Sequence, residues 1–263
     1  MTDLDGLRSF DCITFLEEVL RASSIEDIWS LHTRRMARYG FDRLLYAFSR
    51  FRAPNSVGNP EDSLILSNHD PDYLRSYAKD GLYKAGPMMR WASGNVGAQS
   101  WRMMHDHMRN ERLTADESKV AELNRRFGVV AGYSIGFREV SIRAKGGIGL
   151  CARKGLSQDD VEQIWAEHGR EITVLNNVIH LRISALPYVT RKVLTARQRE
   201  ALEWVGEGKT TQDIATIMGL TAATVEKHLR LAREVLDVET TAQAVLMASF
   251  RNQIFVVPEL KLA

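Results

Sequence analysis

Residues 211–232, TQDIATIMGLTAATVEKHLRLA, place two short helical patterns on either side of a Gly-Leu-Thr break. Two helices joined by so tight a turn are typical of the helix-turn-helix, whose second helix enters the DNA major groove. Their steep crossing needs a small residue at the close approach, here Ala215, and a turn residue that tolerates a positive φ, here Gly219. Thr221 is placed to cap the second helix, and apolar residues fill the angle between the helices: Ile214, Met218, Leu220, Val225 and Leu229. The pattern therefore predicts a DNA-binding motif.

The polar side of the second helix carries residue types that contact nucleic acid. Hydroxyl, imidazole and basic side chains donate to phosphates and base edges, and a glutamate accepts from cytosine N4. We predict that the DNA-contacting residues are Thr221, Thr224, Glu226, Lys227, His228, Arg230 and Arg233. The alternative is a solvated helix face in a small helical bundle, because helical hairpins are common.

The composition is that of a globular protein of one or two domains, with 263 residues, 44% of them hydrophobic and 26% charged. A net charge of +2 does not by itself indicate a nucleic-acid-binding protein, so such a function depends on local charge. Cys12 and Cys151 form no CxxC pattern and predict free thiols in a reducing compartment. No apolar run approaches a membrane span, and the acidic start lacks the basic residues of a secretion signal, so we expect a cytoplasmic protein without membrane contact.

Helical and strand patterns alternate over residues 1–184 and predict an α/β unit around a central sheet. Helices are expected at 11–40 (two, with Ser24 capping the second), 70–81 and 157–186, and strands at 41–51, 62–68, 129–143 and 146–153. Ser157 and Asp160 resemble a capping box, and residues 144–146 are the expected turn between the last two strands. A linker at 185–193 leads to an all-α domain at 194–263, with helices expected at 196–207, 211–218, 222–236 and 240–253.

The stretch 194–245 resembles the DNA-binding domain of LuxR-type transcription regulators. The matching positions occur without gaps at Leu194, Thr195, Arg197, Glu200, Leu202, Gly208, Lys209, Ile214, Ala215, Thr224, Val225 and His228. The resemblance implies a four-helix module whose last helix helps to pair two modules. One position departs from the family: a basic residue usually follows Thr-Val and faces DNA, whereas this chain has Glu226, which repels phosphate.

The N-terminal part resembles, more weakly but in order, the ligand-binding domain of the quorum-sensing branch of this family. Tyr73 and Tyr77 lie one helical turn apart, where the family has an aromatic pair over the lactone, and Trp101 stands where a tryptophan bonds the lactone carbonyl. Pro87 and Gly132 match two further family markers. The resemblance implies an α/β/α sandwich that encloses an acyl-homoserine lactone, and with the helical domain it makes the chain an α+β protein.

Such a ligand needs a long apolar cavity with a few fixed polar groups, and Tyr and Trp offer apolar bodies with polar tips. We predict a ligand-binding set of Tyr73, Tyr77, Gly86, Met88, Trp101 and Ser134. The alternative for each aromatic taken alone is ordinary core, since aromatic side chains are usually buried. Their order upstream of a DNA-binding module favours the pocket.

Gly86 departs from the family, which has an aspartate just before Pro87 that accepts the ligand's amide N–H. Glycine has no side-chain acceptor, and a buried unpaired N–H costs about 1–3 kcal/mol, roughly ten- to a hundredfold in affinity. Asp80, six residues away, is not assumed to substitute. The sequence leaves three possibilities open: a different small molecule, weak lactone binding, or no ligand.

Other constellations are weak. His105-Asp106-His107 has no evident third metal ligand and is better explained as a solvated helix face. The glycine-rich stretch 146–153 lacks the Lys-Ser/Thr ending of a phosphate loop, and Cys151 is expected to be inert core. No nucleophile–base arrangement stands out, so we expect no metal, no cofactor and no enzyme activity.

Two functions compete. The first is a dimeric, ligand-responsive transcription factor that reads a palindromic promoter site, with residues 159–183 as the dimer surface or as packing against their own sheet. The second is a ligand-independent regulator, or an anti-activator that pairs with another regulator, which Glu226 and Gly86 motivate. An enzyme fused to a DNA-binding domain is the least favoured function.

Overall fold

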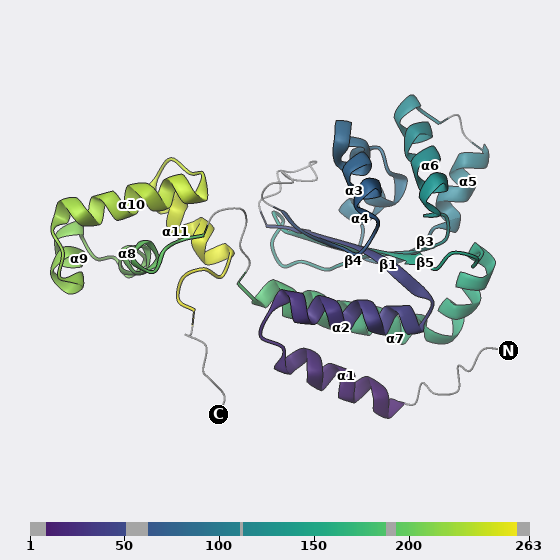
Figure 1. Cartoon of the computed structure of the whole chain (residues 1–263), viewed down its shortest axis with the longest axis horizontal. Helices are drawn as coiled ribbons and strands as arrows, with labels where there is room; N and C mark the ends of the chain where they lie inside the picture. Colours follow the sequence, from purple (N-terminus) through teal and green to yellow (C-terminus); the bar gives the residue numbers. More distant parts are fainter. Residues whose placement is uncertain (1–8, 51–62, 111–112, 188–192, 257–263) are drawn as a thin grey trace. The chain divides into compact units, whose positions relative to one another are not determined.

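The computed structural model describes residues 9–50, 63–110, 113–187 and 193–256 (Figure 1). The chain forms two compact units that divide between Ile183 and Ser184. The first unit is a layer of strands between helices on both faces, and the second unit is helical (Figure 1). This mixed α and β architecture confirms the predicted fold class. No described helix has both the length and the apolar character needed to cross a lipid bilayer.

The sheet of the first unit is antiparallel at every pairing, with the strand order β2-β1-β5-β4-β3. Its strands are β1 Phe41–Ser49, β2 Ser63–Ser67, β3 Gly97–Ser100, β4 Gly132–Gly136 and β5 Lys145–Ala152. β1 and β5 pair in a register that sets Leu45 opposite Gly149 and Tyr46 opposite Ile148. Because neighbouring residues of a strand point to opposite faces, this register decides which side chains meet each helical layer.

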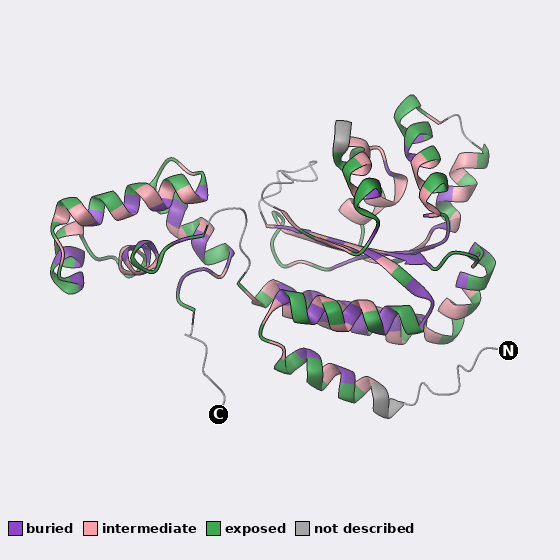
Figure 2. Ribbon diagram, in the orientation of Figure 1, coloured by how far each residue is buried: buried purple, intermediate pink, exposed green. Residues whose placement is uncertain are grey.

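One face of the sheet is covered by α2, Ile25–Arg38, and α7, Gln158–Ala185, with α1, Ser9–Arg21, beside α2 (Figure 1). Buried residues are concentrated in the strands and along these two covering helices (Figure 2). The ring of Trp165 stacks on that of Tyr133 at a centroid distance of 3.8 Å, and His32 joins Asn176 at 3.0 Å. The long α7 helix is therefore packed on its own sheet.

The predicted caps of these helices are confirmed. The Ser24 hydroxyl accepts from the backbone N–H of Asp27 at 3.1 Å. The Ser157 hydroxyl accepts from the N–H of Asp160, and the Asp160 carboxylate accepts in return from the N–H of Ser157 at 2.8 Å. Each cap pairs backbone donors that a helix start leaves free.

The opposite face is covered by a set of short helices, most of which the periodicity did not indicate. They are α3 Pro71–Ala78, the 3-10 helix η2 Lys79–Lys84, α4 Pro87–Gly94, α5 Arg102–Asn110 and α6 Ala115–Phe127. α4 has no fully buried residue, so it has no core stripe that a helical period could reveal. These helices hold the cavity described below.

The expected strand over 129–143 is wrong beyond Gly136, where β4 ends. Val140 and Ile142, which lie in the expected strand, are almost fully exposed in a loop. The turn lies at residues 141–144, closed by the N–H of Ala144 on the C=O of Ser141 at 3.1 Å, and not at 144–146. Exposed apolar residues in a loop imitate a strand period because periodicity does not report burial.

The second unit consists, in its described residues, of α8 Ala196–Gly206, α9 Thr211–Met218, α10 Ala222–Leu236 and α11 Thr241–Phe250. The first three agree with the expected helices to within one residue, whereas α11 ends three residues before the expected position. Gly219 ends α9 with φ of 65°, and Thr221 caps α10 by accepting from the N–H of Thr224. Ile214, Ala215, Val225 and Leu229 form part of one buried cluster, so the apolar angle of the motif is confirmed.

Candidate functional site

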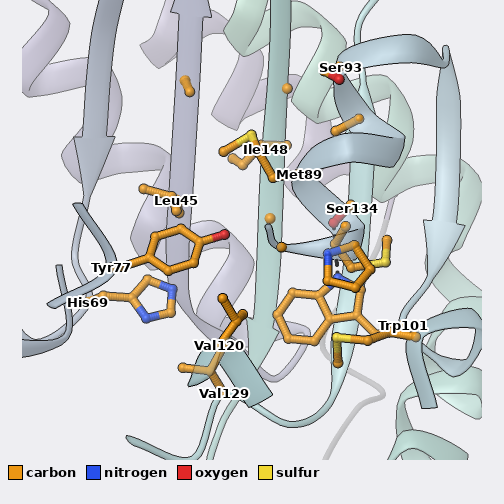
Figure 3. A pocket seen from close by; sticks show the side chains of 18 of the residues that line it. Leu45, His69, Tyr77, Met89, Ser93, Trp101, Val120, Val129, Ser134 and Ile148 are labelled. Carbon is orange, nitrogen blue, oxygen red and sulfur yellow. Dashed lines mark hydrogen bonds between the residues drawn. The ribbon is translucent and has the colours of Figure 1, made fainter. Parts of the chain in front are cut away.

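A cavity of about 140 Å³ lies between the sheet and the short helices of the first unit (Figure 3). Its lining includes all six residues of the predicted ligand-binding set: Tyr73, Tyr77, Gly86, Met88, Trp101 and Ser134. These come from α3, the start of α4, the β3–α5 junction and β4, so segments more than 60 residues apart meet at one site. Whether each residue contacts a ligand stays a prediction.

Three rings form a stack along one wall of this cavity. His69, Tyr73 and Tyr77 are spaced four residues apart, with centroid distances of 5.0 Å for the first pair and 5.5 Å for the second. The Tyr73 hydroxyl donates to Asn124 Oδ1 at 3.0 Å, so Tyr73 offers the ligand its ring and not its polar tip. His69 was not in the predicted set, although its position one turn before Tyr73 could have suggested it. Burial lowers the pKa of His69 to about 4, so the imidazole is neutral at neutral pH.

The hydroxyl of Tyr77 points into the cavity (Figure 3). No described residue accepts or donates a hydrogen bond at this oxygen. Burial raises the pKa of Tyr77 to about 12, so the group remains a neutral O–H. A free hydroxyl of this kind is available to a bound molecule.

Gly86 lies against this hydroxyl. A Cβ built on Gly86 would stand 2.7 Å from the Tyr77 oxygen, closer than real Cβ contacts occur. The backbone of Gly86 has φ of −63° and ψ of 118°, which any residue adopts, so glycine is not required here for a positive φ. The space where a side chain of residue 86 would begin is filled by the Tyr77 hydroxyl.

Trp101 and Ser134 form a pair on the floor of the cavity. The indole Nε1–H donates to Ser134 Oγ at 3.0 Å (Figure 3). The ring of Trp101 rests on Gly132, where an added Cβ would lie 3.0 Å from the indole and 2.1 Å from the backbone oxygen of Leu150. Gly132 is thus needed for Trp101 to lie flat against β4 and β5.

The glycine-rich stretch of β5 is the rest of the floor. Gly147 and Gly149 line the cavity opposite Ala47 and Leu45 of β1. A Cβ on Gly149 would meet Trp101 Cζ2 at 3.8 Å, an ordinary contact, so the missing side chains leave space above the sheet. Apolar side chains close the cavity elsewhere, namely Met88, Met89, Met104, Val120 and Val129. The combination of an apolar enclosure and few polar tips suits a small molecule with an apolar body.

Helix α4 is tied to α6 beside this cavity. Arg90 of α4 forms an ion pair with Glu117, which is buried in the first turn of α6. The backbone N–H of Thr114, with the Thr114 hydroxyl and Arg90 assisting, lowers the pKa of Glu117 to about 2. The carboxylate is therefore ionised at neutral pH, and it holds both the capping box and the neighbouring helix.

The predicted DNA-contacting residues all lie on or at the start of α10, and four of them are exposed: Thr221, Glu226, Lys227 and Arg230. Figure 2 shows exposed and intermediate residues alternating along α10. Lys227 forms no ion pair with any described residue, so its ammonium is open to phosphate. The exposed face is thus the one that carries the predicted residues.

Several of these side chains are engaged within the domain. Glu226 accepts a hydrogen bond from the Thr211 hydroxyl at 2.8 Å, and Arg230 pairs with Glu234 at 2.5 Å. Arg233 donates to the Thr241 hydroxyl at 2.8 Å, and the hydroxyls of Thr224 and Thr221 share a hydrogen bond of 2.9 Å. His228 is half-buried. Arg233 ties α10 to α11, so a role in DNA binding would require it to exchange that partner.

His105 and Asp106 of the His-Asp-His stretch are engaged by neighbouring groups of the first unit. His105 Nε2 lies 2.8 Å from the backbone oxygen of Val130, and Asp106 pairs with Arg109. Among the residues that the structure describes, no group of three His, Cys, Asp or Glu side chains could hold a metal ion. Cys151 is fully buried, and burial raises the pKa of its thiol to about 12.

Comparison with known proteins agrees with this arrangement. The autoinducer binding domain matches residues 24–183, more than half of the chain, and the bacterial regulatory proteins of the luxR family match residues 192–248. The transcriptional activator AnoR of Acinetobacter nosocomialis is 22% identical to this chain, over 89% of this chain and 94% of AnoR. The transcriptional activator SolR of Ralstonia nicotianae is 29% identical, over 80% of this chain and 84% of SolR. The structure of SdiA, an Escherichia coli protein, in complex with octanoyl-rac-glycerol shares the fold, with a TM-score of 0.53 at 16% identity over 95% of this chain and 97% of that one. The chain therefore belongs to the luxR family of bacterial regulatory proteins, with an autoinducer-binding domain ahead of its helix-turn-helix.

Proposed function

We propose that the protein is a transcription regulator that binds an acyl-homoserine lactone or a related small molecule in its cavity and a palindromic promoter site as a dimer. The observation that carries the proposal is the cavity itself, in which the free Tyr77 hydroxyl and the Trp101–Ser134 pair interrupt an otherwise apolar lining. A pocket of this kind in an autoinducer-binding domain suits a ligand with an acyl chain and a small polar head.

The outer side of α7 supports a dimer. Val174 and Leu181 lie seven residues apart on this helix and are 50% and 64% exposed, although the helix packs its other side on the sheet. The buried side of α7 can in this way pack on the sheet while its exposed side packs against a second copy of the chain. Two DNA-binding modules held by such a dimer read half-sites about one helical turn apart.

Native mass spectrometry tests the proposal directly. The full chain is expressed in bacteria with and without a synthase for acyl-homoserine lactones, and its mass is compared. We expect a dimer that carries an added small-molecule mass only when the synthase is present. A monomer without added mass under both conditions contradicts the proposal.

Trp101→Phe is expected to weaken binding of acyl-homoserine lactones by about two- to tenfold, because it deletes the N–H that donates to Ser134 Oγ on the cavity floor and keeps most of the ring. The measurement is calorimetric titration of the full chain with lactones of several chain lengths. Trp165→Phe is the matched control, since Trp165 stacks on Tyr133 on the other face of the sheet. Equal losses of lactone affinity in both variants would assign the effect to general stability. Unchanged affinity in Trp101→Phe would show that the indole N–H has no role in ligand recognition.

Lys227→Ala is expected to weaken promoter binding by roughly tenfold and to lower the salt slope of binding by about one. Arg230→Ala should have a smaller effect, because Arg230 already pairs with Glu234. Gel-shift titrations at several salt concentrations measure both quantities. Arg109→Ala removes an exposed charge from the first unit and serves as the control. Unchanged affinity and salt slope in both α10 variants would contradict the assignment of this face.

A second candidate function is an anti-activator that pairs with another regulator, or a regulator that needs no ligand. Two observations favour it: Gly86 offers no acceptor, and the Glu226 carboxylate lies on the exposed face of α10, where it repels phosphate. Gel shifts with genomic promoter fragments distinguish the two functions. An anti-activator shows no shift of its own and abolishes the shift of the regulator with which it is mixed.

A further inference from the structure

The described lining of the cavity contains no carboxylate. Two of its neutral side-chain oxygens accept hydrogen bonds within the chain: Asn124 Oδ1 from the Tyr73 hydroxyl and Ser134 Oγ from the indole of Trp101. The hydroxyls of Ser49, Ser63 and Ser93 also line the cavity. Lys145 is held by the backbone oxygens of Asn95 and Phe137, at 2.5 Å and 3.1 Å. The described residues therefore offer a ligand no charged acceptor, and their hydroxyl groups are its neutral donors.

The most available of these donors is the Tyr77 hydroxyl. It stands 2.7 Å from the Cβ position of residue 86, and no described residue takes its proton. If this oxygen accepted an N–H from a ligand, its own proton would remain buried and unpaired. A ligand satisfies the hydroxyl only by presenting an acceptor to it.

Building on the proposed function, we infer that the cavity selects an acyl ligand that presents an oxygen acceptor and no N–H at the Tyr77–Gly86 position, an O-acyl ester in preference to an N-acyl amide. Where the resembling family has an aspartate that accepts a hydrogen bond, this chain has Gly86 and, beside it, the Tyr77 hydroxyl that donates one. The ligand must therefore present an acceptor there in place of a donor. An amide N–H placed there would face a donor and lose its hydration without a partner. Such an unpaired buried group lowers affinity by roughly ten- to a hundredfold.

The His69 end of the ring stack suits a neutral head group. His69, one end of the ring stack, has its pKa lowered by burial to about 4 and carries no charge at neutral pH. The ammonium of Lys145 is already held by two backbone oxygens. The neutral His69 therefore cannot compensate the burial of an anionic head, whereas a neutral ester needs no such compensation.

A matched pair of ligands tests the inference. The probes are N-octanoyl homoserine lactone and 2-(octanoyloxy)-γ-butyrolactone, which differ only in an N–H replaced by an oxygen. Calorimetric titration of the full chain is expected to show at least a tenfold preference for the O-acyl compound. Equal affinities, or a preference for the N-acyl compound, overturn the inference and leave the proposed function standing. Binding of neither compound overturns both.

Variants of the chain test the same inference by changing the protein instead of the ligand. Tyr77→Phe removes the oxygen nearest to the Cβ of residue 86, and the next contacts are 3.5 Å or more away. The double variant Gly86→Asp with Tyr77→Phe therefore has room for its carboxylate, and we expect its preference to change to the N-acyl compound by at least tenfold. Circular dichroism verifies that it is folded. A folded double variant that keeps the O-acyl preference contradicts the inference.

Two single variants complete the set. Tyr77→Phe alone should lose affinity for the O-acyl compound by about two- to tenfold, because it deletes the donor. Asp80→Asn examines a carboxylate whose side chain is outside the described residues, and it should leave both affinities unchanged. A loss of N-acyl binding in Asp80→Asn would identify Asp80 as an amide acceptor and overturn the inference.

Discussion

Gly132→Ala is expected to lower the stability of the first unit by about 3 kcal/mol, which corresponds to a fall of roughly 6–12 °C in its unfolding midpoint. The added Cβ would lie 2.1 Å from the backbone oxygen of Leu150 and 3.0 Å from the ring of Trp101. Backbone in the middle of a sheet cannot retreat without disturbing the pairing of β4 with β5. The substitution should therefore separate these strands locally and tilt the Trp101 ring.

Thermal unfolding of the full chain, followed by tryptophan fluorescence, measures this effect. Four of the five tryptophans lie before Ile183, so the signal reports mainly on the first unit. Gly94→Ala is the matched control, because a Cβ at Gly94 meets no other atom within 4 Å. If Gly132→Ala and Gly94→Ala have the same unfolding midpoint, the Leu150 backbone oxygen and the Trp101 ring do not pack tightly against Gly132.

Gly149→Val should strongly weaken ligand binding while the chain still folds. The Cβ itself makes an ordinary contact of 3.8 Å with Trp101, but the two methyl groups beyond it enter a cavity of only about 140 Å³. Overpacking of a filled site costs about 1–3 kcal/mol, so affinity should fall by roughly ten- to a hundredfold.

Titration with 2-(octanoyloxy)-γ-butyrolactone and with N-octanoyl homoserine lactone checks the result. Gly149→Ala adds only the tolerated Cβ and should bind within about threefold of the parent, because an ordinary van der Waals contact costs little. Full affinity in a folded Gly149→Val variant would mean that the ligand does not occupy the space above β5.

The helix-turn-helix could be read from the sequence because its determinants are local. Gly219 takes a positive φ and Thr221 caps the next helix, and both act within a few residues. The interactions of Glu226 could not be read in this way. Its hydrogen bond to Thr211 joins two helices, and only their packing brings the carboxylate to that hydroxyl.

The cavity was partly predictable. The four-residue spacing of Tyr73 and Tyr77 and the position of Trp101 indicated a pocket, and the structure brings these residues to one cavity. The sequence did not indicate β3, whose four residues GAQS have no apolar alternation, or α4, which has no fully buried residue. Both elements form by pairing with or packing on β4 and β5, segments far away in the chain.

By itself, the sequence determined the two-part organisation, the strongly periodic helices such as α2, α7 and those of the second unit with their caps, and the absence of a side chain at Gly86. Composition, helical period and residue identity are properties of the chain. Only the tertiary structure decided that the Tyr77 hydroxyl fills the place beside Gly86 and that Gly132 and Gly149 leave room for Trp101 and a ligand. Those facts are distances between atoms of different elements, and no local pattern contains them. They also decide which hydrogen-bonding group the cavity presents, because the Tyr77 hydroxyl, a donor, occupies the space that a side chain at Gly86 would fill.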